Sequence, residues 1–152
     1  MSRRIVDISS RVEFSAAHKL ESAHLDESEN RALYGPCFND HGHNYALEAT
    51  VRGEIDPRTG MVMNLSDLAE ILREEVYLPM DHKHLNFDVP FLEGVVTTAE
   101  NVAAKCFERI AERLNALPQR GRPGCRLYRI RLFESRNNFV EVLAADEPAP
   151  KS

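Results

Sequence analysis

Two histidines separated by one glycine are the residues of this sequence best suited to chemistry. His41, Gly42 and His43 open a run in which apolar residues mostly alternate with polar ones, as in an extended strand. Side chains two residues apart in a strand lie on the same face, so both imidazoles can chelate one metal ion. Cys37 stands four residues before this pair. A catalytic zinc takes three protein ligands and leaves a position open, so one more ligand is required.

His18 is the best candidate for the third ligand. A strand is predicted over 5–18, and in it Val12, Phe14 and Ala16 share the parity of His18, which places His18 at the end of an apolar face. A single strand histidine is more often held by ordinary hydrogen bonds than by a metal. The combination of His18, His41 and His43 instead predicts a zinc site, and zinc there would polarise substrate oxygens and lower their pKa.

Three further residues could move protons. Cys37 is either a plain loop cysteine or a reactive thiol, since a nearby cation or metal would lower its pKa. Asp81 and His82 combine a carboxylate with an imidazole, which suits proton transfer near neutral pH. Neighbouring residues do not face each other in regular structure, so this pair is predicted to act only from a turn.

Glu134 follows an apolar strand row and has two interpretations. It is either a solvated strand end or a carboxylate that accepts two N–H groups from a guanidine-like edge of a ligand. His24 and His84 have no such context and are interpreted as surface or loop residues. Cys106 and Cys125 lie among apolar residues and are interpreted as core positions.

The remaining periodicity predicts an α+β domain. A long loop is expected over 19–36, and Asn64 and Pro79 are expected to cap and stop the first helix. The second helix is expected near Thr98, with Thr97 and Glu100 in capping-box positions.

The predicted order is ββααββ, a four-stranded antiparallel sheet with both helices on one face. Its elements are strands at 5–18 and about 41–55, helices at 65–76 and about 98–117, and strands at about 126–134 and 139–143. Residues 1–143 are expected to form one domain and 144–152 a disordered tail.

Composition excludes several classes of protein. The chain has 152 residues and a net charge of −5 without a basic block, which argues against nucleic-acid binding. No apolar run approaches the ~18 residues of a membrane span, so no membrane association is expected. The N-terminus lacks the apolar segment of a secretory signal, and the three cysteines do not suggest a disulfide framework. A cytoplasmic location is the resulting expectation.

These motifs together resemble the 6-pyruvoyl-tetrahydropterin synthase and 6-carboxy-tetrahydropterin synthase family. The likeness runs from Phe14 to about Val142. It includes Phe-Ser-Ala-Ala-His18, Cys37 before His41-Gly-His-Asn-Tyr, Gly60-Met-Val-Met-Asn-Leu, Asp81-His-Lys-His-Leu-Asn, Thr97-Thr-Ala-Glu-Asn and Phe133-Glu134.

The resemblance implies a fold, an assembly and an activity. The fold would be the tunnelling fold, assembled as a homohexamer of two stacked trimers with active sites at subunit interfaces. The substrate would be 7,8-dihydroneopterin triphosphate, which loses triphosphate in a lyase step, and Zn2+ would be the cofactor. By the same resemblance, His18, His41 and His43 hold zinc, Cys37 is the base, Asp81 and His82 relay protons, Glu134 anchors the pterin, and Thr97, Thr98 and Glu100 lie beside that pocket.

The product is the open question at the level of sequence. The stretch from Gly53 to Leu65 resembles the animal pyruvoyl enzymes of the tetrahydrobiopterin route. The short spacing from Cys37 to His41 resembles the bacterial carboxy enzymes of the queuosine (7-deazaguanine) route, and because it lies in the active site it favours 6-carboxy-tetrahydropterin and acetaldehyde. An alternative of another class is a non-catalytic pterin-binding module whose zinc is structural, with Cys37 as a fourth ligand.

Overall fold

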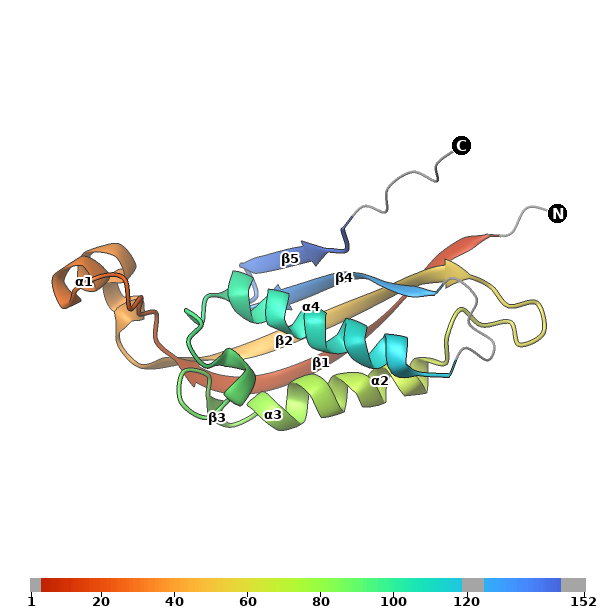
Figure 1. The fold of residues 1–152 in the computed structure, drawn as a ribbon, viewed down its shortest axis with the longest axis horizontal. Helices are drawn as coiled ribbons and strands as arrows, with labels where there is room; N and C mark the ends of the chain where they lie inside the picture. Colours follow the sequence, from red (N-terminus) through yellow and green to blue (C-terminus); the bar gives the residue numbers. More distant parts are fainter. Residues whose placement is uncertain (1–3, 119–124, 146–152) are drawn as a thin grey trace.

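The computed structural model describes residues 4–118 and 125–145 and consists of one sheet with helices across one face (Figure 1). Its strands are β1 (Ile5–His18), β2 (His41–Glu54), β3 (Lys83–His84), β4 (Arg126–Phe133) and β5 (Phe139–Leu143). Its helical segments are α1 (Glu27–Tyr34), η1 (Gly35–Phe38), α2 (Leu65–Leu72), η2 (Arg73–Tyr77), α3 (Leu78–Met80), η3 (Pro90–Leu92) and α4 (Ala99–Ala116).

The sheet has the order β3-β1-β2-β4-β5. β1 and β2 form a long antiparallel pair that runs from Ile5 opposite Glu54 to His18 opposite His41. The four predicted strands and the order ββααββ are confirmed. The sheet is mixed rather than wholly antiparallel, because the short strand β3 pairs in parallel with β1 at Ala16 and Ala17. Two residues carry no periodicity, so sequence patterning could not reveal β3.

The core lies between the sheet and the helices α2 and α4, which cover the same face (Figure 1). Alternation along β1 buries Phe14, Ala16 and His18, as the shared parity predicted. On β2, Tyr45 and Leu47 are buried on that same face. The histidines at the strand ends therefore continue the apolar rows of the core. Cys106 is fully buried on α4, and Cys125 is half-buried beside β4.

Three local expectations differ from the structure. The predicted loop 19–36 contains α1, capped by Asp26, whose side chain accepts a hydrogen bond from the backbone N–H of Glu29. The helix that begins after Asn64 does not stop at Pro79. It passes through a π-helical turn and ends at Met80, one residue after Pro79.

The cap of α4 is Thr98 rather than Thr97. The side-chain oxygen of Thr98 accepts a hydrogen bond from the backbone N–H of Asn101 at 3.2 Å. Thr97 is fully buried, and its hydroxyl points instead toward the carbonyl oxygen of Lys19 at 3.2 Å. A side chain that is used inside the protein cannot also cap the helix.

The C-terminal part of the chain is described only in part. The backbone N–H of Ala144 donates to the carbonyl oxygen of Tyr128 at 2.9 Å, so ordered pairing continues one residue past β5. The rest of the predicted disordered tail, residues 146–152, lies outside the described residues. Within the described ranges, the helices are all too short or too polar to cross a lipid bilayer.

Candidate metal centre and active site

The three predicted metal ligands meet at one end of the sheet. Each of His18, His41 and His43 offers one ring nitrogen, and these nitrogens lie within 4.8 Å of one another. The ring centroids of His18 lie 4.6 Å from His41 and 5.1 Å from His43. The register explains the meeting, since His18 lies opposite His41 and Ala16 lies opposite His43. The predicted triad is a metal-binding arrangement.

Backbone carbonyls fix the orientation of two of these rings. The Nδ1 atom of His18 lies 2.8 Å from the carbonyl oxygen of Thr97, and that of His41 lies 2.7 Å from the carbonyl oxygen of Asn39. A carbonyl only accepts, so both Nδ1 atoms carry the proton, and each Nε2 presents a lone pair. Such partners are typical of the groups that orient metal-binding histidines.

The buried nitrogens fit a metal ion better than they fit a protein core. Among the described residues, the Nε2 atoms of His18 and His43 are buried and make no hydrogen bond, although an oxygen of Glu134 lies 3.4 Å from Nε2 of His43. Leaving such a group unpaired costs about 1–3 kcal/mol, so a missing partner is indicated. Burial lowers the pKa of His18 to about 4, and it also lowers the pKa of His43. Both rings are therefore neutral at neutral pH, as metal ligands must be.

Glu134 and Tyr45 extend the site on the same face of the sheet. An oxygen of Glu134 lies 3.4 Å from Nε2 of His43. Because Ala46 pairs with Phe133, the register places Tyr45 directly across from Glu134. The Tyr45 hydroxyl is buried without a hydrogen-bond partner in the described part of the chain, and burial together with the charge of Glu134 raises its pKa.

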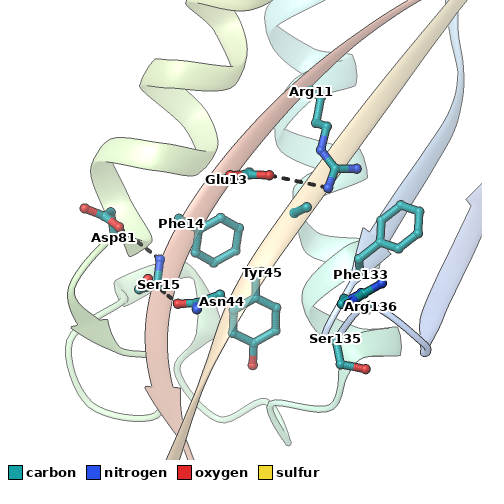
Figure 2. A pocket seen from close by; sticks show the side chains of 11 residues that line it. Arg11, Glu13, Phe14, Ser15, Asn44, Tyr45, Asp81, Phe133, Ser135 and Arg136 are labelled. Carbon is teal, nitrogen blue, oxygen red and sulfur yellow. Dashed lines mark hydrogen bonds and ion pairs between the residues drawn. The ribbon is translucent and has the colours of Figure 1, made fainter.

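Asp81 and His82 form the predicted pair in a turn. His82 has a φ of 58°, in the left-handed region, and this conformation brings its Nδ1 to 2.7 Å from Oδ2 of Asp81. The other carboxylate oxygen accepts a hydrogen bond from the backbone N–H of Ser15 at 3.0 Å (Figure 2). The Ser15 amide and His82 lower the pKa of Asp81. Asp81 therefore carries a negative charge next to an exposed imidazole.

Asp81 borders a hollow on the face of the sheet that the helices leave open. Figure 2 shows this hollow, whose volume is about 520 Å³, with Arg11, Ser15 and Asp81 among its lining residues. Ser15 and Asn44, which face this side, are joined by a hydrogen bond of 2.7 Å. The metal triad lies on the opposite face, so Asp81 and the triad approach the strand ends from different sides.

Cys37 lies in η1, on the connection that leads into β2. Its side chain is half-buried, and its carbonyl oxygen accepts a hydrogen bond from the backbone N–H of Leu20 at 2.8 Å. In the described ranges, the cluster of groups that could hold a metal consists of the three histidines and does not include Cys37. This arrangement agrees with a thiol that lies on the segment leading to His41 and does not itself bind the metal.

The remaining predicted site residues have identifiable structural positions. Thr97 is buried behind His18, Thr98 caps α4, and Glu100 is exposed in the first turn of that helix. His24 is an exposed loop residue, as expected. His84 is not a loop residue, since it belongs to β3. The backbone N–H of Asn86 donates to its Nδ1 at 3.3 Å, so its Nε2 carries the proton and donates to Oδ1 of Asp40 at 3.0 Å.

Comparison with known proteins is informative for the whole chain. The family described as "6-pyruvoyl tetrahydropterin synthase" matches residues 7–145. The human protein named 6-pyruvoyl tetrahydrobiopterin synthase is 44% identical over 135 residues, which are 88% of each chain. The protein of that name from Dictyostelium discoideum is 40% identical and covers 92% of this chain and 96% of its own.

More distant and structural relatives agree with this grouping. A 6-carboxy-5,6,7,8-tetrahydropterin synthase from Haemophilus influenzae is 28% identical over 153 residues, covering 84% of this chain and 95% of its own. The structure of the Caenorhabditis elegans 6-pyruvoyl tetrahydropterin synthase superposes with a TM-score of 0.84 at 34% identity and covers 95% of this chain and 100% of its own. The fold is therefore the tunnelling fold of these enzymes, and the chain belongs to the 6-pyruvoyl tetrahydropterin synthase family of pterin-forming lyases.

Proposed function

We propose that the protein is a zinc-dependent 6-pyruvoyl-tetrahydropterin synthase that converts 7,8-dihydroneopterin triphosphate with release of triphosphate. The preference for the carboxy product, drawn from the short spacing between Cys37 and His41, is not supported by the relatives. The human and Dictyostelium proteins named for the pyruvoyl product are 44% and 40% identical, whereas the Haemophilus carboxy enzyme is 28% identical.

The observation that carries the proposal is the triad of imidazole nitrogens within 4.8 Å of one another. Three histidines without a fourth protein ligand are typical of a catalytic zinc with an open position. Zinc bound there would supply Lewis-acid polarisation of the side-chain oxygens of the substrate. Glu134, beside His43, would accept N–H groups from the pterin ring and hold it next to this position, with Thr98 and Glu100 at the rim.

Proton transfer would fall to residues outside the metal shell. Cys37 would remove a proton from the substrate side chain, and the imidazole of His82 would pass protons to and from solvent, held by Asp81. The hydrogen bond of 2.7 Å between Asp81 and His82 fixes which ring nitrogen faces the carboxylate and leaves the other for the reaction.

Assembly is part of the proposal. Within the described residues, β5 pairs on one edge only, and β1 pairs with β3 only at Ala16 and Ala17, so both sides of the sheet keep open strand edges. Phe139 and Leu143 of β5 are 51% and 54% exposed. Long open edges are usually covered, and pairing β1 with β5 of another copy would do so. We propose that the copies form a homohexamer with active sites between subunits, which would bring Asp81 and His82 toward a neighbouring metal site.

Analysis of the reaction products tests the proposal. The purified zinc-loaded protein is incubated with 7,8-dihydroneopterin triphosphate under anaerobic conditions. We expect one triphosphate per substrate and 6-pyruvoyl-tetrahydropterin, which retains all the side-chain carbons, so that no acetaldehyde is formed. Acetaldehyde in equal amount with a 6-carboxy product would replace this proposal by the carboxy activity, which the spacing of Cys37 and His41 favours. Binding of the pterin without release of triphosphate would indicate the non-catalytic module.

A further inference from the structure

The side chain of Asn86 forms a hydrogen-bonded clamp on the chain directly after His18. Its Oδ1 accepts a hydrogen bond from the backbone N–H of Lys19 at 3.1 Å, and its Nδ2 donates to the carbonyl oxygen of Lys19 at 2.9 Å. One amide group thus satisfies both backbone groups of one residue. Asn86 lies five residues after Asp81, at the end of the loop that carries the proton-transfer pair.

The clamp is connected to the metal ligand through Thr97. The Thr97 hydroxyl lies 3.1 Å from Oδ1 of Asn86 and 3.2 Å from the carbonyl oxygen of Lys19, and it donates to one of them at a time. The carbonyl oxygen of Thr97 in turn accepts the Nδ1 proton of His18. Asn86 therefore holds both the residue after His18 and the residue that orients its ring.

The clamp is also connected to the thiol. Leu20, the residue after Lys19, donates its backbone N–H to the carbonyl oxygen of Cys37 at 2.8 Å. On the other side of Cys37, Asp40 accepts the hydrogen bond of His84, and the backbone N–H of Asn86 holds that ring by its Nδ1. The segment from Cys37 to His41 is thus held by two hydrogen bonds, one from Leu20 to Cys37 and one from His84 to Asp40. Asn86 supports both, because it binds Lys19, which precedes Leu20, and the ring of His84.

We propose that Asn86 is a positioning residue that sets the distance between the Cys37 thiol and the metal ligand His18. Asn86 is connected to Cys37 through Lys19 and Leu20, and to His18 through Thr97. The roles at the two ends rest on the proposed function, but the connection between them does not. Groups that hydrogen-bond a metal ligand hold it in one orientation, and their loss typically weakens metal affinity about 10- to 100-fold. Asn86 acts one step further out, because it supports such a group, Thr97.

The test compares two Asn86 variants with a matched control. Asn86→Ala removes the clamp. Asn86→Asp keeps an acceptor for the Lys19 N–H but places a second oxygen against the Lys19 carbonyl, where a donor is needed. Asn64→Ala is the control, because Asn64 caps α2 with a hydrogen bond of 2.9 Å to the N–H of Ser66, and losing a cap costs about 1 kcal/mol without touching the site.

Two readouts separate positioning from mere stability. Zinc affinity is measured by competition with a chromophoric chelator, and the alkylation rate of Cys37 is measured by mass spectrometry, with Cys125 as the internal reference. We expect both Asn86 variants to bind zinc at least roughly 10-fold more weakly and to expose Cys37 to faster alkylation. The Asn64 variant should unfold at a lower temperature with both readouts unchanged.

The proposal is overturned if the folded Asn86 variants keep wild-type zinc affinity and wild-type Cys37 reactivity, because Asn86 would then stabilise the fold and nothing more. Neither readout uses substrate. If the two readouts shift as expected while the wild-type protein forms no pterin product, the proposed function fails and the positioning role of Asn86 stands.

Discussion

The candidate site has a metal half, formed by His18, His41 and His43, and a proton-transfer half, formed by Cys37, Asp81 and His82. The two halves are built in different ways. His18 is 1% exposed at the end of a paired strand, and its ring is fixed by a backbone carbonyl. The side chain of His82 is 83% exposed, and the residue lies in a left-handed turn that its backbone N–H joins to β1 by a hydrogen bond to the carbonyl oxygen of Ser15 at 2.6 Å. The three histidine ligands all come from one chain, whereas His82 faces outward. In the proposed enzyme, the triad would hold the metal rigidly, and proton transfer would be left to groups that the substrate or another subunit completes.

The largest expected effect comes from breaking the metal half. His41→Ala removes a ligand whose ring is partly exposed, so the fold should survive. Metal content, measured by atomic emission, should fall from about one zinc per chain to nearly none, since two remaining imidazoles make a poor site. Triphosphate release should disappear with it.

The matched control is His24→Ala, which removes an exposed histidine of the loop before α1. It should keep full metal content and activity. If His41→Ala also retained zinc, the triad would not be the metal site, and the contrast between the two halves would lose its basis.

Predictability from the sequence follows the same division. The strand ends were predictable because period-2 alternation fixes which side chains share a face, and His18, His41 and His43 were placed correctly by parity alone. The clamp formed by Asn86 and the hydrogen bond between His84 and Asp40 could not be predicted from the sequence. They join residues far apart in the chain through a few side-chain hydrogen bonds, and such contacts leave no periodic pattern in the sequence. Thr97 was assigned to a cap because its inward contact with Lys19 depends on tertiary structure.

The second prediction concerns pH and the apo protein. The pKa of His18 is lowered from its ordinary value of 6.5 to about 4 by burial. Between these values the unfolded chain binds more protons than the folded one, so stability is lost as the pH falls from about 6.5 to about 4. The loss should reach roughly 3 kcal/mol, at 1.36 kcal/mol per pH unit. Urea unfolding of the chelator-treated protein at several pH values measures it.

His18→Gln provides the comparison for the pH series, because glutamine does not titrate. The variant should show a shallower slope between pH 4 and 6.5, and a slope equal to that of the wild type would mean that other groups carry the acid sensitivity.

A smaller effect is expected at Tyr45, where the metal half meets Glu134. Tyr45→Phe keeps the ring, which stacks on Phe14 at 5.0 Å, and removes a hydroxyl that is buried without a partner in the described ranges. Replacing an unpaired buried hydroxyl with an apolar group is neutral or stabilising, so the free energy of unfolding of the apo protein should stay the same or rise by about 1 kcal/mol. Tyr34→Phe, at a half-buried position on α1, is the control. A loss of stability at Tyr45 would indicate that its hydroxyl has a partner such as an enclosed water molecule.

The separation of the two halves is the central claim, and the zinc content of Cys37→Ala tests it most directly. If the three histidines complete the metal site, the variant should keep about one zinc per chain, as Cys125→Ala should, while triphosphate release falls by at least about 100-fold through loss of the base. Loss of zinc from Cys37→Ala would contradict the account, because Cys37 would then be a fourth ligand of a closed, structural site.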